Sequence, residues 1–190
     1  MPFSDSPPQR LPAGFEGLLE HHLDGLYRFA LSLTRQPAEA EDVLQDSVLK
    51  GLEAFGRFEA GGNFKAWIFA ILMNTFRDRY RHLQRRRVLE VPLDDLVDPP
   101  SVGEEVFDLM LKEEVLGALE ELPADFRHAV HLVDLEGMSY REASQVLDCP
   151  TGTLTSRLNR GRKLLKVSLA NLARERGLLA GEAENQGRPL

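Results

Sequence analysis

The chain has 190 residues, of which 43% are hydrophobic and 28% charged, and this composition is ordinary for a globular protein of one or two small domains. The formal net charge is −7, and the single cysteine, Cys149, excludes an internal disulfide and argues against a zinc site built from cysteines. Neither a long apolar run nor a signal peptide is present, so we predict a cytoplasmic protein without membrane insertion.

Two helices are predicted at the start of the chain. The first spans residues 15 to 35, where an apolar stripe recurs every three or four residues, and Gln36-Pro37 ends it. The second spans residues 38 to 55 and packs through Ala40, Leu44, Val48, Leu52 and Phe55.

The second helix carries another face made of Asp42, Gln45, Asp46 and Leu49. An acidic face is most often only solvated, but a leucine among the acids indicates a docking surface for a partner. Composition alone leaves both interpretations open.

Asn63 is predicted to cap a third, long helix that begins with an aromatic and apolar stripe and then becomes strongly basic. Residues 77 to 87 contain six arginines and one acid, Asp78, and four polar residues lie along one side: Asn74, Arg77, Arg81 and Arg85. Basic residues interleaved with aromatics are typical of surfaces that bind single-stranded nucleic acid. Most of the aromatics, including Trp67, are nevertheless expected in the core.

The stretch from 89 to 103 is acidic and broken by prolines, as in a flexible linker. A helix is predicted to resume at about residue 104 and to join a second domain. The expected architecture is therefore all-α, with two helical domains at residues 13 to 88 and 104 to 176, the acidic linker between them, and a frayed tail from 177 to 190.

The second domain contains the most informative pattern, a helix-turn-helix. Ser139 is predicted to cap a helix from Tyr140 to Leu147, the residues Asp148-Cys149-Pro150 break it, and Thr151 caps the next helix. Residues 151 to 166 hold five basic residues and no acid, although the whole chain is acidic. A solvated basic face on an ordinary helical hairpin is the alternative interpretation.

One face of this last helix, through Leu154, Leu158, Gly161, Leu165 and Leu169, is predicted to pack. The opposite side is predicted to meet duplex DNA through Thr153, Thr155, Ser156, Arg157, Arg160 and Lys163. Basic side chains supply contacts to phosphates, whereas polar side chains near the helix N-terminus are placed to reach base edges.

Three motifs together resemble the bacterial RNA polymerase sigma factors of the extracytoplasmic-function type, within the sigma-70 family. The first motif resembles the helix that binds core polymerase and spans residues 38 to 55, AEAEDVLQDSVLKGLEAF. The second motif is similar to the segment that recognises and melts the minus-ten element and spans residues 64 to 87, FKAWIFAILMNTFRDRYRHLQRRR. The third motif resembles the domain that reads the minus-thirty-five element and spans residues 122 to 165, LPADFRHAVHLVDLEGMSYREASQVLDCPTGTLTSRLNRGRKLL.

The resemblance implies roles for the residues that match. Asp42, Gln45, Asp46 and Leu49 would face the clamp of the largest polymerase subunits, Asn74 and the arginines after it would hold the minus-ten strand, and the acidic linker would follow the RNA path. The protein would then be an alternative sigma factor, responsive to stress or envelope signals, that directs promoter-specific initiation and is held inactive by an anti-sigma factor.

Some positions depart from the family pattern. Asp148 stands where the turn usually has glycine, Ala143-Ser144 replaces a large apolar residue followed by alanine, and Thr155 occupies a position where lysine is common. Asp tolerates a left-handed backbone, so the turn is expected to persist. The preferred promoter cannot be transferred from the family.

An autonomous helix-turn-helix regulator is the main alternative function, but it leaves the acidic face and the basic end of the third helix without a use. No glycine loop for phosphates, nucleophile elbow or paired-carboxylate site is apparent, so no enzymatic activity and no cofactor are predicted. His21, His22, His128 and His131 lack further ligands at a suitable spacing and are predicted to be surface or packing residues rather than metal ligands.

Overall fold

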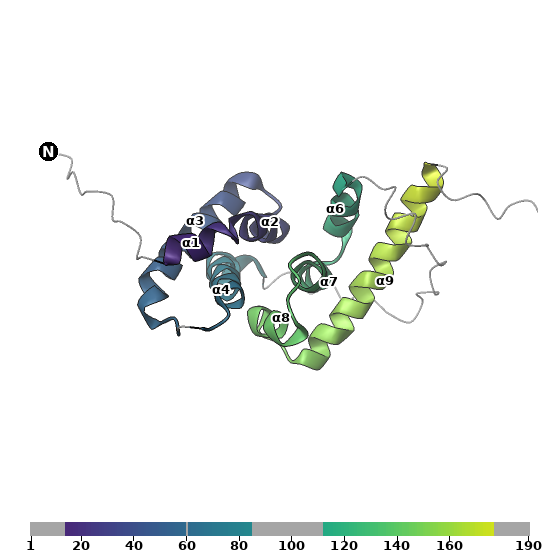
Figure 1. The fold of residues 1–190 in the computed structure, drawn as a ribbon. Coiled ribbons are helices and arrows are strands. Elements are labelled where there is room, and N and C mark those ends of the chain that lie inside the picture. The colour runs from purple at the N-terminus through teal and green to yellow at the C-terminus, as the bar shows by residue number, and fades with distance from the viewer. Residues whose placement is uncertain (1–13, 60, 85–111, 177–190) are drawn as a thin grey trace, which may run out of the picture. The chain divides into compact units, whose positions relative to one another are not determined.

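The computed structural model describes residues 14–59, 61–84 and 112–176, and within these ranges the regular structure is helical, without strands (Figure 1). This confirms the predicted all-α class. The chain forms two compact units, of which the first holds α1 to α4 together with residues 141–148, and the second holds the rest of the described residues from 112 onward. The predicted acidic linker, residues 89 to 103, and the tail lie outside the described residues.

The described residues from 14 to 84 in the first unit form the α-helices α1 (Phe15–Glu20), α2 (Leu23–Thr34), α3 (Pro37–Ala54) and α4 (Phe64–Gln84), with a short 3-10 turn, η1 (Phe55–Arg57), after α3. The prediction of one helix over residues 15 to 35 is wrong, because the chain breaks at His21 and His22. There the backbone N–H of His22 donates to the carbonyl of Leu19 at 2.8 Å, and φ of His22 is −118°. Apolar spacing continues across the break, so periodicity alone did not reveal it.

The other boundaries of the first unit follow local chemistry. Arg35 takes a left-handed conformation, with φ of 61°, that ends α2, and Pro37 is at the start of α3, where its missing N–H costs no helical hydrogen bond. The predicted cap of α4 is confirmed, since the side-chain oxygen of Asn63 accepts a hydrogen bond from the backbone N–H of Ala66 at 3.0 Å.

The core of this unit lies between α2, α3 and α4. Its largest fully buried side chains include Phe15, Leu26, Phe29, Ile68, Phe69 and Leu72. The ring of Trp67, a half-buried residue, lies 5.0 Å from that of Phe58 and 5.5 Å from that of Phe64. Packing therefore occupies much of the aromatic surface that a single strand could have used. The predicted core role holds for Phe64, Phe69 and Phe76, which are buried, but is wrong for Trp67, which is only half-buried.

The second unit contains α6 (Lys112–Glu121), α7 (Ala124–Val130), a π-helical turn η2 (His131–Leu135) and the long α9 (Thr151–Glu175). The predicted inner stripe of α9 is correct: Leu154, Leu158, Gly161 and Leu169 are buried, and Leu165 is half-buried against the cluster that includes Ala118. Burial of this stripe fixes which side of α9 is left for solvent or for a partner.

Helices α7 and α9 approach closely at Gly161. A Cβ at this position would lie 2.7 Å from Cγ2 of Val130 and 3.1 Å from the carbonyl oxygen of Phe126. We expect Gly161→Ala to lower the free energy of unfolding by about 1–3 kcal/mol, since the backbone cannot yield as a flexible side chain would. Urea unfolding followed by circular dichroism measures this change.

Gly152→Ala is the matched control, because this glycine lies on the same helix and nothing stands within 4 Å of a Cβ there. This variant is expected to be neutral or stabilising by up to about 1 kcal/mol, the usual preference of a helix for alanine over glycine. Equal midpoints for the two variants would contradict the close approach at Gly161.

The four histidines considered as metal ligands, His21, His22, His128 and His131, are in the places expected of packing and surface residues. His128 and His131 are buried, and Nε2 of His131 lies 3.7 Å from Oε1 of the buried Glu136. His21 is exposed and contacts the Gly17 carbonyl, and His22 stacks on Phe64. In the described ranges no three histidine, cysteine or acidic residues are grouped to hold a metal ion, and no helix there is long and apolar enough to cross a membrane.

Candidate docking and nucleic-acid interfaces

The four residues predicted to bind a partner lie together on the outer side of α3. Asp42, Gln45, Asp46 and Leu49 are all exposed, and Leu49, at 58%, is the most exposed of the large apolar residues that the structure describes. The opposite side of α3 buries Ala40, Val43 and Ser47. Tertiary packing therefore leaves this mixed acidic and apolar surface, called the docking face below, exposed on the first unit.

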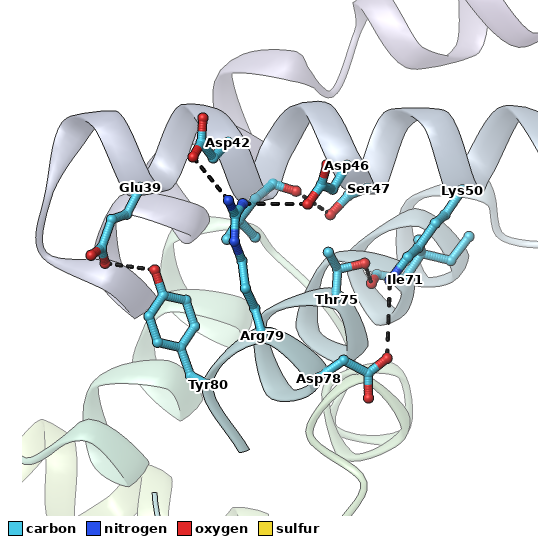
Figure 2. Close-up of polar contacts among 11 residues, drawn as sticks. Glu39, Asp42, Asp46, Ser47, Lys50, Ile71, Thr75, Asp78, Arg79 and Tyr80 are labelled. Carbon is cyan, nitrogen blue, oxygen red and sulfur yellow. Dashed lines mark hydrogen bonds and ion pairs between the residues drawn. The ribbon is translucent and has the colours of Figure 1, made fainter. Parts of the chain in front are cut away.

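Two of the docking-face carboxylates are held by an arginine that the sequence did not single out. Nη2 of Arg79, on α4, lies 2.9 Å from Oδ2 of Asp42, and Nη1 lies 3.3 Å from Oδ2 of Asp46 (Figure 2). The guanidinium thus spans one helical turn of α3, because Asp42 and Asp46 are four residues apart on one side of the helix.

Two further polar contacts join α3 to α4 on either side of Arg79 (Figure 2). The hydroxyl of Tyr80 donates to Oε2 of Glu39 at 2.6 Å, and Nζ of Lys50 lies 4.0 Å from Oδ2 of Asp78. Burial, together with the hydrogen bond to the Glu39 carboxylate, raises the pKa of Tyr80 to about 12. The hydroxyl therefore stays protonated, and able to donate, at neutral pH.

The residues predicted to bind the minus-ten strand are placed only in part. Asn74 is exposed on α4, and Nη1 of the half-buried Arg77 lies 3.4 Å from its side-chain oxygen. Arg81 belongs to α4, but its side chain, like the whole of Arg85, lies outside the described residues. The structure brings Asn74 and Arg77 together on one side of the helix, and the role of all four residues stays a prediction.

The helix-turn-helix has the predicted order: α8 (Tyr140–Leu147), a turn at Asp148 to Pro150, and α9. Asp148 has φ of 50°, which is the left-handed conformation that the turn was predicted to keep with an aspartate at this position. The predicted capping role of Thr151 is wrong by one position, because Thr151 is already the first helical residue and Pro150 precedes it as the N-cap. The hydroxyl of Ser144 donates to the Arg141 carbonyl, within α8.

The outer side of α9 presents most of the residues predicted to meet duplex DNA. Thr153, Ser156 and Arg160 are exposed, and Thr155 and Lys163 are half-buried. The hydroxyl of Thr155 donates to the Thr151 carbonyl at 2.9 Å, so the helix itself uses this donor. Asn159 is also exposed on this side of α9, although the sequence prediction left it out. It lies three residues after Ser156, and this helical spacing places both residues on the same side.

Two arginines of α9 instead lie at the borders of the packed side, where acids of the second unit pair with them. Nη2 of Arg157 lies 2.7 Å from Oδ2 of Asp125, and Arg162 contacts both carboxylate oxygens of Asp134, at 2.5 and 3.0 Å. Chiefly through this hydrogen-bonded contact, the pKa of Arg162 rises further above its already high value. The ion pair with Asp125 engages only one of the donor nitrogens of Arg157. Because a guanidinium has five N–H groups, the remaining N–H groups of Arg157 are able to contact a base in this geometry.

The arrangement agrees with comparisons to known proteins. Sigma-70 region 2 matches residues 18–86, which contain the docking face and α4, and Sigma-70 region 4 matches residues 112–165, which contain the helix-turn-helix. The chain belongs to the ECF sigma factors of RNA polymerase. This is a family of transcription initiation factors, so the protein is an alternative sigma factor that directs transcription, and an autonomous regulator is not favoured.

Individual relatives span both units of this sigma factor. The chain is 37% identical to the ECF sigma factor EcfG of Rhodopseudomonas palustris, over 76% of its own length and 78% of the relative. It is 34% identical to the ECF sigma factor SigE of Mycolicibacterium smegmatis over 85% of its length, but spans only 63% of that relative. A solved structure of the sigma factor RpoE with the anti-sigma factor NepR, from Bartonella quintana, has a TM-score of 0.62 and 33% identity, and the match covers 82% of this chain and 96% of RpoE.

Proposed function

We propose that the first unit docks on the clamp of core RNA polymerase through Asp42, Gln45, Asp46 and Leu49. One observation carries this proposal: an apolar side chain and two carboxylates are exposed on one side of a helix whose other side is buried. Exposed leucine surrounded by charge fits a surface that is covered in a complex. Promoter recognition would follow from the domains at residues 13–88 and 104–176, joined by the acidic segment 89–103.

The two nucleic-acid surfaces would act on different forms of the promoter. Asn74, Arg77, Arg81 and Arg85 would hold the opened minus-ten strand, where capture of an unstacked base offsets a pairing cost of a few kcal/mol. Thr153, Thr155, Ser156, Arg157, Arg160 and Lys163 would hold the minus-thirty-five duplex. None of these steps requires a catalytic group or a cofactor, and all of them would take place in the cytoplasm, where the polymerase acts.

An anti-sigma factor is the proposed regulator. Its support is the similarity to RpoE, which was solved in complex with the anti-sigma factor NepR. A protein that covered the docking face of α3 would prevent polymerase binding, and the responsive signal would act by releasing it. A stress or envelope signal is the proposed stimulus.

Run-off transcription tests the proposed function directly. Purified core polymerase is incubated with fragmented genomic DNA, with and without this protein, and the transcripts are sequenced. Discrete transcripts that depend on the protein are expected. If no transcripts form and no core binding is detected, while the protein alone retards duplex DNA as a dimer, an autonomous regulator would replace the proposal.

A further inference from the structure

Arg79 contacts the docking face without belonging to it. Its guanidinium reaches from α4 to one oxygen of each carboxylate, Oδ2 in both Asp42 and Asp46. Because no contact to Oδ1 of either residue is found in the described part of the chain, the second oxygens remain for another donor. Figure 2 shows the two carboxylates on the α3 side of the guanidinium, with Arg79 approaching from α4.

Stability of the fold is a weak explanation for this arrangement. The side chains of Arg79, Asp42 and Asp46 are 40%, 58% and 50% exposed, and ion pairs as exposed as these contribute little to the free energy of folding. The helices α3 and α4 are already joined by buried contacts such as those of Gly51 with Ile68. What the guanidinium does determine is the orientation of two side chains that would otherwise rotate freely.

A cationic partner would benefit from that orientation. Two carboxylates and one guanidinium carry a net charge of −1, so the group still attracts a basic side chain. Carboxylates that are already fixed lose less conformational entropy when the partner binds. Arg79 therefore lowers the attraction somewhat and lowers the entropic cost of binding at the same time.

We propose that Arg79 is a positioning residue, which holds Asp42 and Asp46 as a preformed pair of acceptors for one basic side chain of core RNA polymerase. This inference rests on the proposed function of the docking face. It adds a specific component that the sequence pattern of α3 does not contain, namely a cation supplied by α4. The acceptors are the two Oδ1 atoms, and the bound group is a guanidinium or an ammonium.

The test compares Arg79→Ala with Lys50→Ala. Each variant removes one positive charge that joins α3 to α4. Arg79→Ala removes the ion pairs with Asp42 and Asp46, whereas Lys50→Ala removes only the pair with Asp78. Labelled full-length protein is titrated with core polymerase and the dissociation constant is measured by fluorescence anisotropy. We expect about tenfold weaker binding for Arg79→Ala and no more than about a twofold change for Lys50→Ala, in line with the cost of immobilising two side chains.

The direction of the change separates positioning from simple charge attraction. Arg79→Ala makes the group more negative, so attraction alone predicts tighter binding to a basic partner. Arg79→Lys keeps the charge but offers a single nitrogen to two carboxylates, and an intermediate loss is expected. Thermal unfolding of all variants verifies that they remain folded, and Arg79→Lys serves as the test if Arg79→Ala does not.

A paired variant, Asp42→Asn with Asp46→Asn, distinguishes failure of this inference from failure of the docking face. If the paired variant loses core binding while the Arg79 variants bind as the unchanged protein does, or more tightly, only the positioning role is overturned. If the paired variant itself binds core polymerase normally, both the docking role of this face and the positioning role of Arg79 are excluded. Loss in the paired variant with no further loss on adding Arg79→Ala supports the inference, because the arginine then acts only through these carboxylates.

Discussion

Asp46→Arg is expected to abolish association with core RNA polymerase while leaving the protein folded. The substitution reverses a charge on the exposed docking face and places a second guanidinium beside Arg79, which now lies 3.3 Å from the Asp46 carboxylate. A basic group on the polymerase would then meet a net positive surface, and a like charge at an interface costs several kcal/mol. Co-purification of the variant with tagged core polymerase measures the loss.

Glu20→Arg is the matched control for Asp46→Arg. Glu20 is also an exposed acid, but it lies at the end of α1 and not on the helix that carries the docking face, and the charge change is identical. This control should co-purify with core polymerase as the unchanged protein does, and both variants should show the same helical circular dichroism. Normal co-purification of Asp46→Arg would exclude this face as the polymerase contact.

Arg157→Ala is expected to cost about 1–3 kcal/mol of discrimination between a promoter and DNA with a scrambled minus-thirty-five element, if the side chain reads a base. The protein would be assembled with core polymerase and its affinity measured on both DNAs at one salt concentration. Arg162→Ala should instead weaken binding about equally on the two DNAs, since the positive charge that it removes attracts the phosphates of any sequence alike.

The ion pair with Asp125 supplies a control for Arg157. Asp125→Ala breaks the same 2.7 Å contact but keeps the guanidinium, so it should share any loss of stability with Arg157→Ala and keep the discrimination. Equal loss of discrimination in both variants would mean that Arg157 acts by fixing α9 against α7. Equal losses on matched and scrambled DNA would refute base reading by Arg157.

Features encoded within a few residues were predictable from the sequence. Asn63 caps α4 and Asp148 takes the left-handed conformation of the turn, and both follow from side-chain chemistry that acts over three or four positions. The exposed side of α3 and the buried side of α9 were also correct, because helical periodicity sorts residues by side. The family resemblance depended on motifs of the same local kind.

Features that depend on contacts between helices were not predictable. The spacing of Asp42 and Asp46 showed that they share a side of α3, but not that Arg79, more than thirty residues later, would reach them. Likewise helical spacing places Arg157 at the border of the packed side of α9, but it does not show that Asp125 of α7 pairs with it. Which partner a long side chain selects depends on the register of two helices, and spacing within one helix does not determine it.

The close approach at Gly51 has a mechanical consequence for the proposed roles. A Cβ there would lie 2.7 Å from Cδ1 of Ile68, so the Ile68 side chain of α4 packs directly against the backbone of α3, and such close packing resists sliding of the two helices along each other. The docking face and Asn74 are thereby separated by a fixed length of rigid protein. Attachment of α3 to the polymerase would then fix the distance between the enzyme surface and the minus-ten strand.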